Sequence, residues 1–162
     1  MVSWAIGRPV GSLMLSALLF ADPATASSGG WADASKRYNI PVDLLYAIAR
    51  VETGNKGNLV SPKNKNGTYD IGLMQINSIH LPRLKKMNIT KETLLSDPCV
   101  NLHVGAFILS EFISKHGYTW QAIDSYNAGR PTSHKTYAKK VYAMHARIQK
   151  EQMMASKKKD KK

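Results

Sequence analysis

The sequence predicts an all-α domain of five to seven helices that holds at most one small β-hairpin. Apolar residues recur at helical spacing, most clearly in the stripe formed by Leu44, Leu45, Ile48 and Val51. Residues that favour helix starts and stops bound several such stretches. The 162 residues are enough for one domain with a hydrophobic core, and the sequence contains no repeat and no domain boundary.

Helix boundaries follow from capping residues, prolines and glycines. Pro41 and Pro98 suit the first position of a helix, and Thr90 and Thr119 suit the capping position. Gly117 is expected to end the helix that Pro98 begins. That helix is apolar nearly all round, so we expect it to be central. The expected helices span residues 31–38, 41–53, 90–95, 98–116, 120–125 and about 134–149.

The segments between these helices are polar or broken by proline. Residues 55–69 are rich in Asn, Gly and Lys, which predicts a loop or a small hairpin around Asn66-Gly67. Residues 72–77 are expected to open a short helical turn. Residues 80–87 are broken by Pro82 and are expected to be a connection, and residues 126–131 are expected to be a turn.

The N-terminal residues have the three parts of a secretory signal peptide. Arg8 supplies a modest positive region, residues 10–21 are apolar, and Ala24-Thr25-Ala26 is a small-residue cleavage site. An uncleaved anchor is the alternative, but about 12 apolar residues are short for a span that needs roughly 20. We therefore expect a signal peptide at 1–26, a domain at 27–150 and a flexible Lys-rich tail at 151–162. The mature chain is expected to lack a transmembrane segment and to be soluble outside the cytoplasm.

The chain is strongly basic. Its formal net charge is +12, and removal of the signal peptide takes away Arg8 and Asp22, one charge of each sign. This field favours anionic partners such as cell wall, lipid head groups or nucleic acid. The lysines at 157–162 are interpreted as a solvated, disordered end. No aromatic residues alternate with them as in single-strand binders, so no nucleic acid is expected.

The cysteine and histidine content predicts neither an internal disulfide nor a metal site. Cys99 is the only cysteine, and its place at the start of an apolar helix predicts that it is buried. The five histidines are scattered, without the spacing of zinc ligands. We expect no metal, no cofactor and a monomeric chain.

Glu52 is the strongest candidate for a catalytic residue. Ile48, Ala49 and Val51 place apolar side chains around it, and the end of a helix disfavours its negative charge. Both effects raise the pKa of a carboxyl, which would make Glu52 a proton donor near neutral pH. Gly54 lets the backbone turn away and leave the side chain in a cleft. A solvated glutamate at a helix end is the alternative.

Four segments carry a resemblance to a known family. They are Val51-Glu52-Thr53, Gly72-Leu73-Met74-Gln75-Ile76-Asn77, Asn101-Leu102-His103-Val104-Gly105-Ala106 and Ser125-Tyr126-Asn127-Ala128-Gly129. In this order and spacing they resemble the catalytic domain of the soluble lytic transglycosylases, which is related to goose-type lysozyme. The likeness covers about residues 31–130. It is closest to small periplasmic members encoded with secretion, conjugation and pilus systems, which implies a lysozyme-like α-domain in the periplasm.

The resemblance implies a role for each matching residue. Glu52 would be the single catalytic acid and base. Tyr126 and Asn127 would form the opposite wall, with Tyr126 orienting the carboxyl of Glu52. Asn101 would be a buried polar residue near the floor of the cleft. The residues implied to line the glycan groove are Gly72, Leu73, Met74, Gln75 and Asn77.

Two of these implied roles concern direct contact with substrate. Gln75 would hydrogen-bond the substrate, and Met74 would pack on the face of a sugar. From the residues alone, core packing is the alternative for Leu73 and Met74. A helix stop is the alternative for residues 126–129, and that segment can serve both purposes.

The implied function is that of a peptidoglycan lytic transglycosylase. Such an enzyme cleaves the β-1,4 bond between N-acetylmuramic acid and N-acetylglucosamine and leaves 1,6-anhydro ends. The implied partners are components of a secretion or conjugation apparatus, for which the wall would be opened locally. If Asp70 faces Glu52, it could hold a water and make the enzyme a lysozyme-type muramidase. A non-catalytic wall-binding assembly protein is a further alternative, and DNA binding through the basic tail is the least favoured.

The sequence departs from these relatives at one position. They tend to carry a cysteine near the start of the domain that could pair with the cysteine of the Asp-Pro-Cys segment. Here that region reads Gly29-Gly30-Trp31, so Cys99 has no partner. The departure concerns a stabilising crosslink and not the active site.

Overall fold

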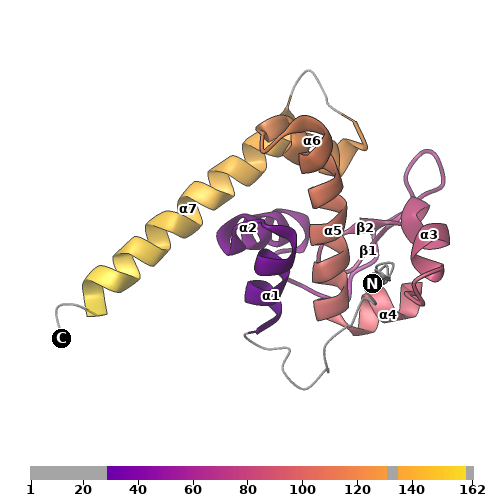
Figure 1. The fold of residues 1–162 in the computed structure, drawn as a ribbon, viewed down its shortest axis with the longest axis horizontal. Helices are drawn as coiled ribbons and strands as arrows, with labels where there is room; N and C mark the ends of the chain where they lie inside the picture. Colours follow the sequence, from indigo (N-terminus) through magenta and orange to yellow (C-terminus); the bar gives the residue numbers. More distant parts are fainter. Residues whose placement is uncertain (1–28, 131–134, 160–162) are drawn as a thin grey trace, which may run out of the picture.

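The computed structural model describes residues 29–130 and 135–159, and within them the chain is all-α with one two-stranded hairpin (Figure 1). The expected fold class is therefore confirmed. The signal peptide expected at 1–26 lies outside the described residues. The helices are α1 (Gly29–Tyr38), α2 (Val42–Thr53), α3 (Leu81–Lys85), α4 (Lys91–Ser96), α5 (Pro98–His116), α6 (Trp120–Ala128) and α7 (Thr136–Lys159), and the strands are β1 (Asp70–Ile71) and β2 (Ile76–Asn77).

Helix α5 is the central helix, as its all-round apolar sequence predicts (Figure 1). Pro98 occupies its first turn, and the Asp97 carboxylate accepts hydrogen bonds from the backbone N–H groups of Cys99 and Val100 at 2.9 and 3.0 Å. These bonds satisfy donors that a helix start leaves unpaired. Helices α1, α4 and α6 pack against α5, and its residues 101–106 are all buried.

Helices α2 and α7 lie along one another and form the second part of the core. Leu45 and Ile48 of α2 are buried, as are Val141 and Ile148 of α7. Burying four such side chains stabilises the fold by about 1.5–3 kcal/mol each. In the first turn of α2 the Asp43 carboxylate contacts α7: it lies 2.7 Å from His145 Nε2 and accepts a hydrogen bond from Gln149 Nε2 at 3.1 Å.

The loop expected at residues 55–69 is present, with a single antiparallel bridge between Val60 and Ile71, but the two-stranded hairpin follows it. β1 and β2 pair antiparallel with Asp70 opposite Asn77 and Ile71 opposite Ile76, so residues 72–75 form the turn. The helical turn expected at 72–77 is therefore wrong. Gly72 and Gln75 both adopt positive φ, 73° and 48°, which reverses the chain instead of continuing a helix. Residues 64–68 form a tight turn without strands.

Two further boundaries differ from the prediction. Residues 81–85 form helix α3 although Pro82 was expected to break the segment. A proline in the first turn of a helix costs no hydrogen bond, because the N–H groups there have no partner within the helix. Helix α6 continues to Ala128 instead of ending at Ser125, and Gly129 ends it with φ 69°. Tyr126 and Asn127 are therefore helical and not part of a turn.

Helix α7 runs ten residues beyond its predicted end at residue 149. It reaches Lys159, so residues 151–159 are helical and not the flexible tail that the sequence predicts. Residues 149–159 are exposed, and this end of α7 extends away from the other helices (Figure 1). The segment consists mainly of good helix formers, and Arg147 pairs with Glu151 one turn along.

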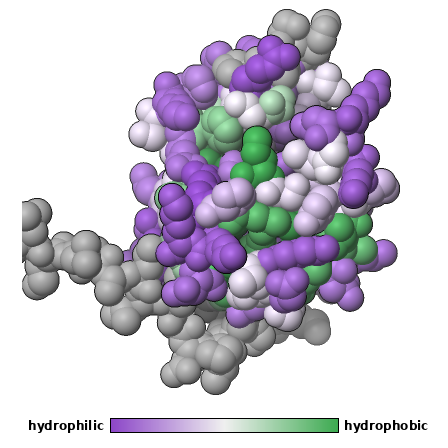
Figure 2. Space-filling view, turned by 90° about the vertical axis from the view of Figure 1, so that its right-hand side faces the viewer, coloured by the Kyte–Doolittle hydropathy of each residue, from purple (hydrophilic) through white to green (hydrophobic). Residues whose placement is uncertain are grey.

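The outer surface is mixed in character. On the face drawn in Figure 2, hydrophilic side chains dominate and hydrophobic ones gather near the centre. Across the described ranges, 29–130 and 135–159, we find no helix that combines the length and the hydropathy needed to cross a bilayer.

Candidate active site

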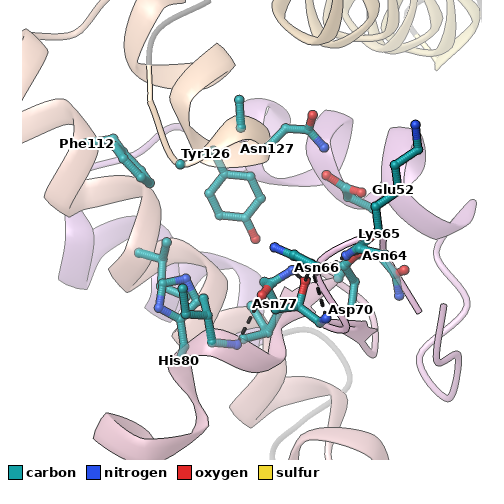
Figure 3. Close-up of a pocket in the computed structure, with 17 residues that line it drawn as sticks. Glu52, Asn64, Lys65, Asn66, Asp70, Asn77, His80, Phe112, Tyr126 and Asn127 are labelled. Atoms are coloured by element: carbon teal, nitrogen blue, oxygen red, sulfur yellow. Dashed lines mark hydrogen bonds between the residues drawn. The ribbon is translucent and has the colours of Figure 1, made fainter. Parts of the chain in front are cut away.

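An open cleft of about 770 Å³ lies where α2, the hairpin, α5 and α6 meet (Figure 3). Glu52 lies on one side of it, and His80 and Phe112 lie on the other. Its walls mix amide, hydroxyl, charged and apolar side chains. The lining residues are Glu52, Asn64, Lys65, Asn66, Thr68, Asp70, Gln75, Ile76, Asn77, Ile79, His80, Ile108, Phe112, Tyr126, Asn127, Ala128 and Gly129.

Glu52 lies in the last turn of α2, just before Gly54 ends the helix with φ 62°. The pKa of its carboxyl is raised from 4.5 to about 7, chiefly by burial and to a smaller extent by the nearby charge of Asp70. A hydrogen bond from Tyr137 and the charge of Lys140 act in the opposite direction. Near neutral pH the carboxyl is therefore partly protonated, as the sequence predicts, and can donate a proton.

Tyr137 holds the carboxyl of Glu52 in place. Its hydroxyl donates to Glu52 Oε1 at 2.5 Å, from the first turn of α7. The sequence predicts this role for Tyr126 instead, and that prediction is wrong. The Tyr126 hydroxyl donates to the backbone carbonyl of Met74 at 2.7 Å. In the sequence Tyr137 is one of the apolar-face residues of the last helix, and only its need for a hydroxyl partner once buried hints at more.

The side chain of Asn101 holds the hairpin turn in place through hydrogen bonds to the backbone. It is fully buried, with Oδ1 accepting from the backbone N–H of Met74 at 2.8 Å. Its Nδ2 donates to the carbonyls of Ile71 and Leu94, both at 2.9 Å. A Cβ at Gly72 would lie only 2.1 Å from this Nδ2, so no larger residue fits there. Asn101 is thus the buried polar residue that the sequence predicts, but neither it nor Gly72 lines the cleft.

Leu73 and Met74 belong to the core. They are 6% and 0% exposed, so the predicted packing of Met74 on a sugar face is wrong. The Met74 side chain lies against Gly105 of α5, where an added Cβ would come within 2.7 Å of it. The carbonyl of Leu73 accepts a hydrogen bond from Thr53 Oγ1 at 3.1 Å, which ties the turn to the end of α2 beside Glu52.

Gln75 and Asn77 line the cleft, as the sequence predicts. Gln75 Nε2 donates to the carbonyl of Gly72 at 2.9 Å, which orients its amide across the turn. Asn77 Nδ2 donates to Asp70 Oδ1 at 2.7 Å (Figure 3), and Asn77 Oδ1 accepts from the backbone N–H of Ile79 at 3.0 Å. The side-chain amides of Gln75 and Asn77 are thus held in fixed orientations where the hairpin borders the cleft.

Asp70 faces the cleft with both carboxylate oxygens engaged. Oδ1 accepts from Asn77, and Oδ2 accepts from Ser61 Oγ and Asn64 Nδ2 at 3.4 Å each. These bonds connect β1 to the loop that carries Lys65 and other lining residues. Asp70 is therefore an anchor of this loop and a source of negative charge near Glu52.

The wall across from Glu52 comes from α5, α6 and the segment before α3. Tyr126 and Asn127 of α6 also line the cleft, the first half-buried and the second exposed. Phe112 and His80 join them. Burial and the neighbouring Arg83 lower the pKa of His80, so this side chain is neutral near pH 7.

Comparison with known proteins decides the family. Residues 30–149 match the family model described as "Transglycosylase SLT domain". The chain belongs to this family. As a transglycosylase of the SLT family it is a lyase that cleaves the glycan strands of peptidoglycan.

Curated relatives agree with the family match. Invasion protein IagB of Salmonella typhimurium is 44% identical over 128 residues, which cover 76% of this chain and 79% of the relative. Protein IpgF of Shigella flexneri is 42% identical over 122 residues, covering 73% and 80%. A peptidoglycan-binding-like protein of Escherichia coli O157:H7 is 37% identical over 141 residues, covering 81% and 84%.

A solved structure shows the same fold. It is an inactive mutant of lytic transglycosylase Slt from Pseudomonas aeruginosa, with a TM-score of 0.56 and 18% identity. The similarity covers 75% of this chain and 24% of the larger protein, so this SLT transglycosylase spans about a quarter of that one.

Several cleft residues of this SLT transglycosylase are absent from the sequence-based prediction. The loop residues Asn64, Lys65 and Asn66 lie in a segment without helical or strand periodicity, and only its composition marked it as a loop. His80 and Phe112 come from elements predicted to be a connection and a buried helix. No sequence signal placed these groups around Glu52. Within residues 29–130 and 135–159, no three His, Cys, Asp or Glu side chains come together as a metal site.

Proposed function

We propose that Glu52 is the single acid and base of a reaction that leaves 1,6-anhydromuramic ends on the glycan strand. The observation that carries the proposal is the partly buried carboxyl of Glu52, whose pKa is about 7 and which accepts a hydrogen bond from Tyr137 at the wall of the cleft. A carboxyl with this pKa exists in both protonation states at neutral pH, which a residue that acts first as acid and then as base requires.

The reaction begins with proton donation. Protonated Glu52 donates to the glycosidic oxygen between N-acetylmuramic acid and N-acetylglucosamine, and the C1–O bond breaks through an oxocarbenium-like state. The N-acetylglucosamine part leaves with a new hydroxyl group. Glu52 is then a carboxylate beside a positively polarised C1.

The second half of the reaction restores the enzyme. The Glu52 carboxylate takes the proton of the muramic C6 hydroxyl, and that oxygen attacks C1 of its own sugar to close the 1,6-anhydro ring. The nucleophile is already part of the substrate, so no second carboxylate and no water are consumed. Ordinary glycosidases use two carboxylates for the same bond.

Substrate binding falls to the amides and rings around the cleft. Gln75, Asn77 and Asn127 offer hydrogen bonds to hydroxyl and acetamido groups, and Tyr126 and Phe112 offer ring surface. The buried turn behind them, from Gly72 to Met74, contributes by keeping Gln75 in place.

Mass spectrometry of products tests the reaction. The purified protein is incubated with isolated sacculi, with Glu52→Gln in parallel. We expect released muropeptides that are one water lighter than hydrolysis products, and none from the variant. Full activity of Glu52→Gln would refute the mechanism.

A lysozyme-type hydrolase is the second candidate, because Asp70 also lines the cleft. Hydrogen bonds to both of its oxygens favour the anchoring role over activation of water. Asp70→Asn is therefore expected to retain the anhydro products while turnover decreases. Products with free reducing ends, together with complete loss of activity in Asp70→Asn, would support the hydrolase. If the protein binds sacculi but releases no product from them, the result would support a non-catalytic assembly protein.

We place this activity in the periplasm, after signal-peptide cleavage at Ala26, in a monomeric domain at 27–150. The biological role proposed is local opening of the wall for a secretion or conjugation apparatus. Support comes from the family resemblance and from the relative named as an invasion protein. Deletion of the gene should reduce secretion, and the active-site variant Glu52→Gln should fail to restore it.

A further inference from the structure

Three aromatic side chains remain exposed away from the catalytic cleft. Tyr118, Trp120 and Tyr142 are 54%, 40% and 57% exposed, and we call them the aromatic patch. None of them lines the cleft. Aromatic residues bury large areas when they have a partner, so three exposed together on one surface suggest a ligand.

The backbone brings the patch together. Thr119, the N-cap of α6, is extended with φ −128° and ψ 159°, and the exposed Tyr118 and Trp120 flank it in the chain. The rings of Trp120 and Tyr142 meet edge to face, with centroids 5.2 Å apart and planes at 87°. Trp120 at the start of α6 and Tyr142 of α7 thus form one surface, and Tyr118 lies two residues before Trp120 in the α5–α6 connection.

The patch and the cleft share two helices. Helix α6 carries Trp120 at its first residue and Tyr126 at the cleft, a separation of about 9 Å along the axis at 1.5 Å per residue. Helix α7 carries Tyr137, which binds Glu52, and Tyr142 about 7.5 Å further along. The two helices run antiparallel, because Ala138 N–H bonds to Asp124 at 3.4 Å while Trp120 meets Tyr142.

We propose that the aromatic patch is a second, non-catalytic binding site for the glycan strands of peptidoglycan. The C–H faces of sugar rings pack on exposed aromatic rings, and the indole N–H and phenol O–H groups can bond hydroxyl and acetamido groups. Trp and Tyr supply this contact at a low cost in side-chain entropy. We choose glycan as the ligand because the SLT family acts on peptidoglycan. The proposal does not depend on whether the reaction leaves 1,6-anhydro ends.

Charge favours the same ligand. Lys139 is exposed one helical turn before Tyr142 on α7. Peptidoglycan carries carboxylates on its stem peptides, so a cation beside the rings matches an anionic glycan strand. A second contact on one polymer also raises the local concentration of glycan at the cleft, because the second binding event becomes intramolecular.

The binding test uses the full chain with Glu52→Gln, so that no turnover occurs, and purified sacculi as the ligand. Adding Trp120→Ala and Tyr142→Ala is expected to weaken binding about tenfold. Trp120→Phe with Tyr142→Phe keeps two rings and should retain most of the affinity, which separates loss of rings from loss of folding. The matched control is Met153→Ala with Met154→Ala, because these side chains on α7 are also exposed, by 58% and 59%.

Turnover completes the test. In the chain with Glu52 intact, Trp120→Ala with Tyr142→Ala should slow release from sacculi but leave cleavage of a short soluble tetrasaccharide unchanged. Unaltered binding to sacculi, or an equal loss in the methionine control, would overturn the site. The site would also be overturned if the Trp120→Ala, Tyr142→Ala chain lost as much activity on the tetrasaccharide as on sacculi. Capture of a protein without glycan that depends on the aromatic patch would likewise overturn it. If neither the native chain nor any variant releases product, but loss of the rings still weakens binding to sacculi, the proposed reaction is refuted and the proposed binding site is supported.

Discussion

The surroundings of Glu52, Tyr137 among them, set the protonation of its carboxyl. Burial disfavours the charged form and Asp70 adds to this effect, whereas the Tyr137 hydroxyl and Lys140 favour the carboxylate. Burial dominates, so the pKa of Glu52 rests at about 7 and not at 4.5. Tyr137 is itself buried beside this charge, and its own pKa is raised well above the ordinary value, so it remains a donor. The side chain that moderates the acid therefore also orients it.

Removal of the Tyr137 hydroxyl tests this balance. In Tyr137→Phe the carboxylate loses a donor, so the pKa of Glu52 should increase above about 7. The alkaline limb of kcat/KM, which reports loss of the Glu52 proton, should move to higher pH, and kcat should decrease roughly tenfold as the carboxyl loses its orientation. Tyr142→Phe removes an exposed hydroxyl from the same helix and should leave the profile unchanged. An unmoved alkaline limb in Tyr137→Phe would contradict the assignment.

Glu52 also makes folding depend on pH. Its folded-state pKa of about 7 lies above the value of 4.5 for a free carboxyl, so the folded state binds the proton more tightly. The resulting stability is fully present below pH 4.5 and is lost as pH rises through 7, by about 3 kcal/mol. Glu52→Gln cannot ionise, so it should be more stable than the native chain at pH 8 by about this amount and similar at pH 4. Urea unfolding at both pH values measures the difference, and equal gains at both would exclude this cause.

The hairpin turn is the element that positions the cleft residues. Asn101 of α5 bonds Met74 N–H and the carbonyls of Ile71 and Leu94, and Thr53 of α2 bonds the carbonyl of Leu73. Four backbone groups of buried segments are thus satisfied by two side chains. The turn connects the helix that carries the acid to the strands that carry Asp70 and Asn77.

Loss of the Asn101 amide should destabilise the whole domain. Asn101→Ala leaves a buried N–H and two buried carbonyls without their partner, which costs about 3 kcal/mol or more. Asn127→Ala is the matched control, because Asn127 lines the cleft but is exposed, and its effect on stability should remain within about 0.5 kcal/mol. Thermal unfolding of the two variants distinguishes them. Similar melting temperatures would show that Asn101 does not support the turn.

At the scale of the whole molecule, α5 joins the two parts of the core. α1 packs on one side of it and α6 on another, while α7 closes over α2 and brings Tyr137 to Glu52. The contact of α1 with the start of α5 is close: a Cβ at Gly30 would lie 3.1 Å from Cys99 Sγ and 3.9 Å from Cys99 Cβ. Cys99 is a free, partly buried thiol. The full burial expected for it is not observed.

This spacing predicts that Gly30→Cys forms a disulfide with Cys99. The Cβ–Cβ separation of 3.9 Å is close to the mean of disulfides, about 3.8 Å. Closing a loop of about 70 residues should stabilise the oxidised chain by about 3–4 kcal/mol, and a reducing agent should abolish the gain. Thiol titration and thermal unfolding with and without reductant measure both effects. Gly30→Cys with Cys99→Ser is the control, and two titratable thiols in the oxidised single variant would refute the geometry.

Local signals in the sequence predicted much of the fold. Thr90 and Thr119 cap the helices at which they were expected, because a capping bond joins residues two or three apart and needs no distant partner. The turn at residues 72–75 was wrongly predicted as helical, because its shape depends on hydrogen bonds to Asn101, which lies 27 residues after Met74 and 30 after Ile71. No local pattern reveals such contacts.

The candidate site divides in the same manner. The sequence predicted a raised pKa for Glu52 from its apolar neighbours and its place at the end of α2, and in the structure burial is the main cause of the raised value. Which tyrosine reaches the carboxyl could not follow from them. Tyr126 and Tyr137 both lie near Glu52, and the packing of α7 on α2 gives the bond to Tyr137 while Tyr126 bonds Met74.

The sequence by itself determined the fold class, most of the helix starts and the family resemblance, and it singled out Glu52 as the candidate acid, because residues near one another in the chain carry those signals. Tertiary structure alone decided that Leu73 and Met74 are core residues, that Asp70 anchors a loop, and that Lys65, His80 and Phe112 join the cleft. It also decided that Trp120 and Tyr142 meet on one surface. These pairings depend on how α5, α6 and α7 pack, and packing is a property of the assembled core and not of any single segment.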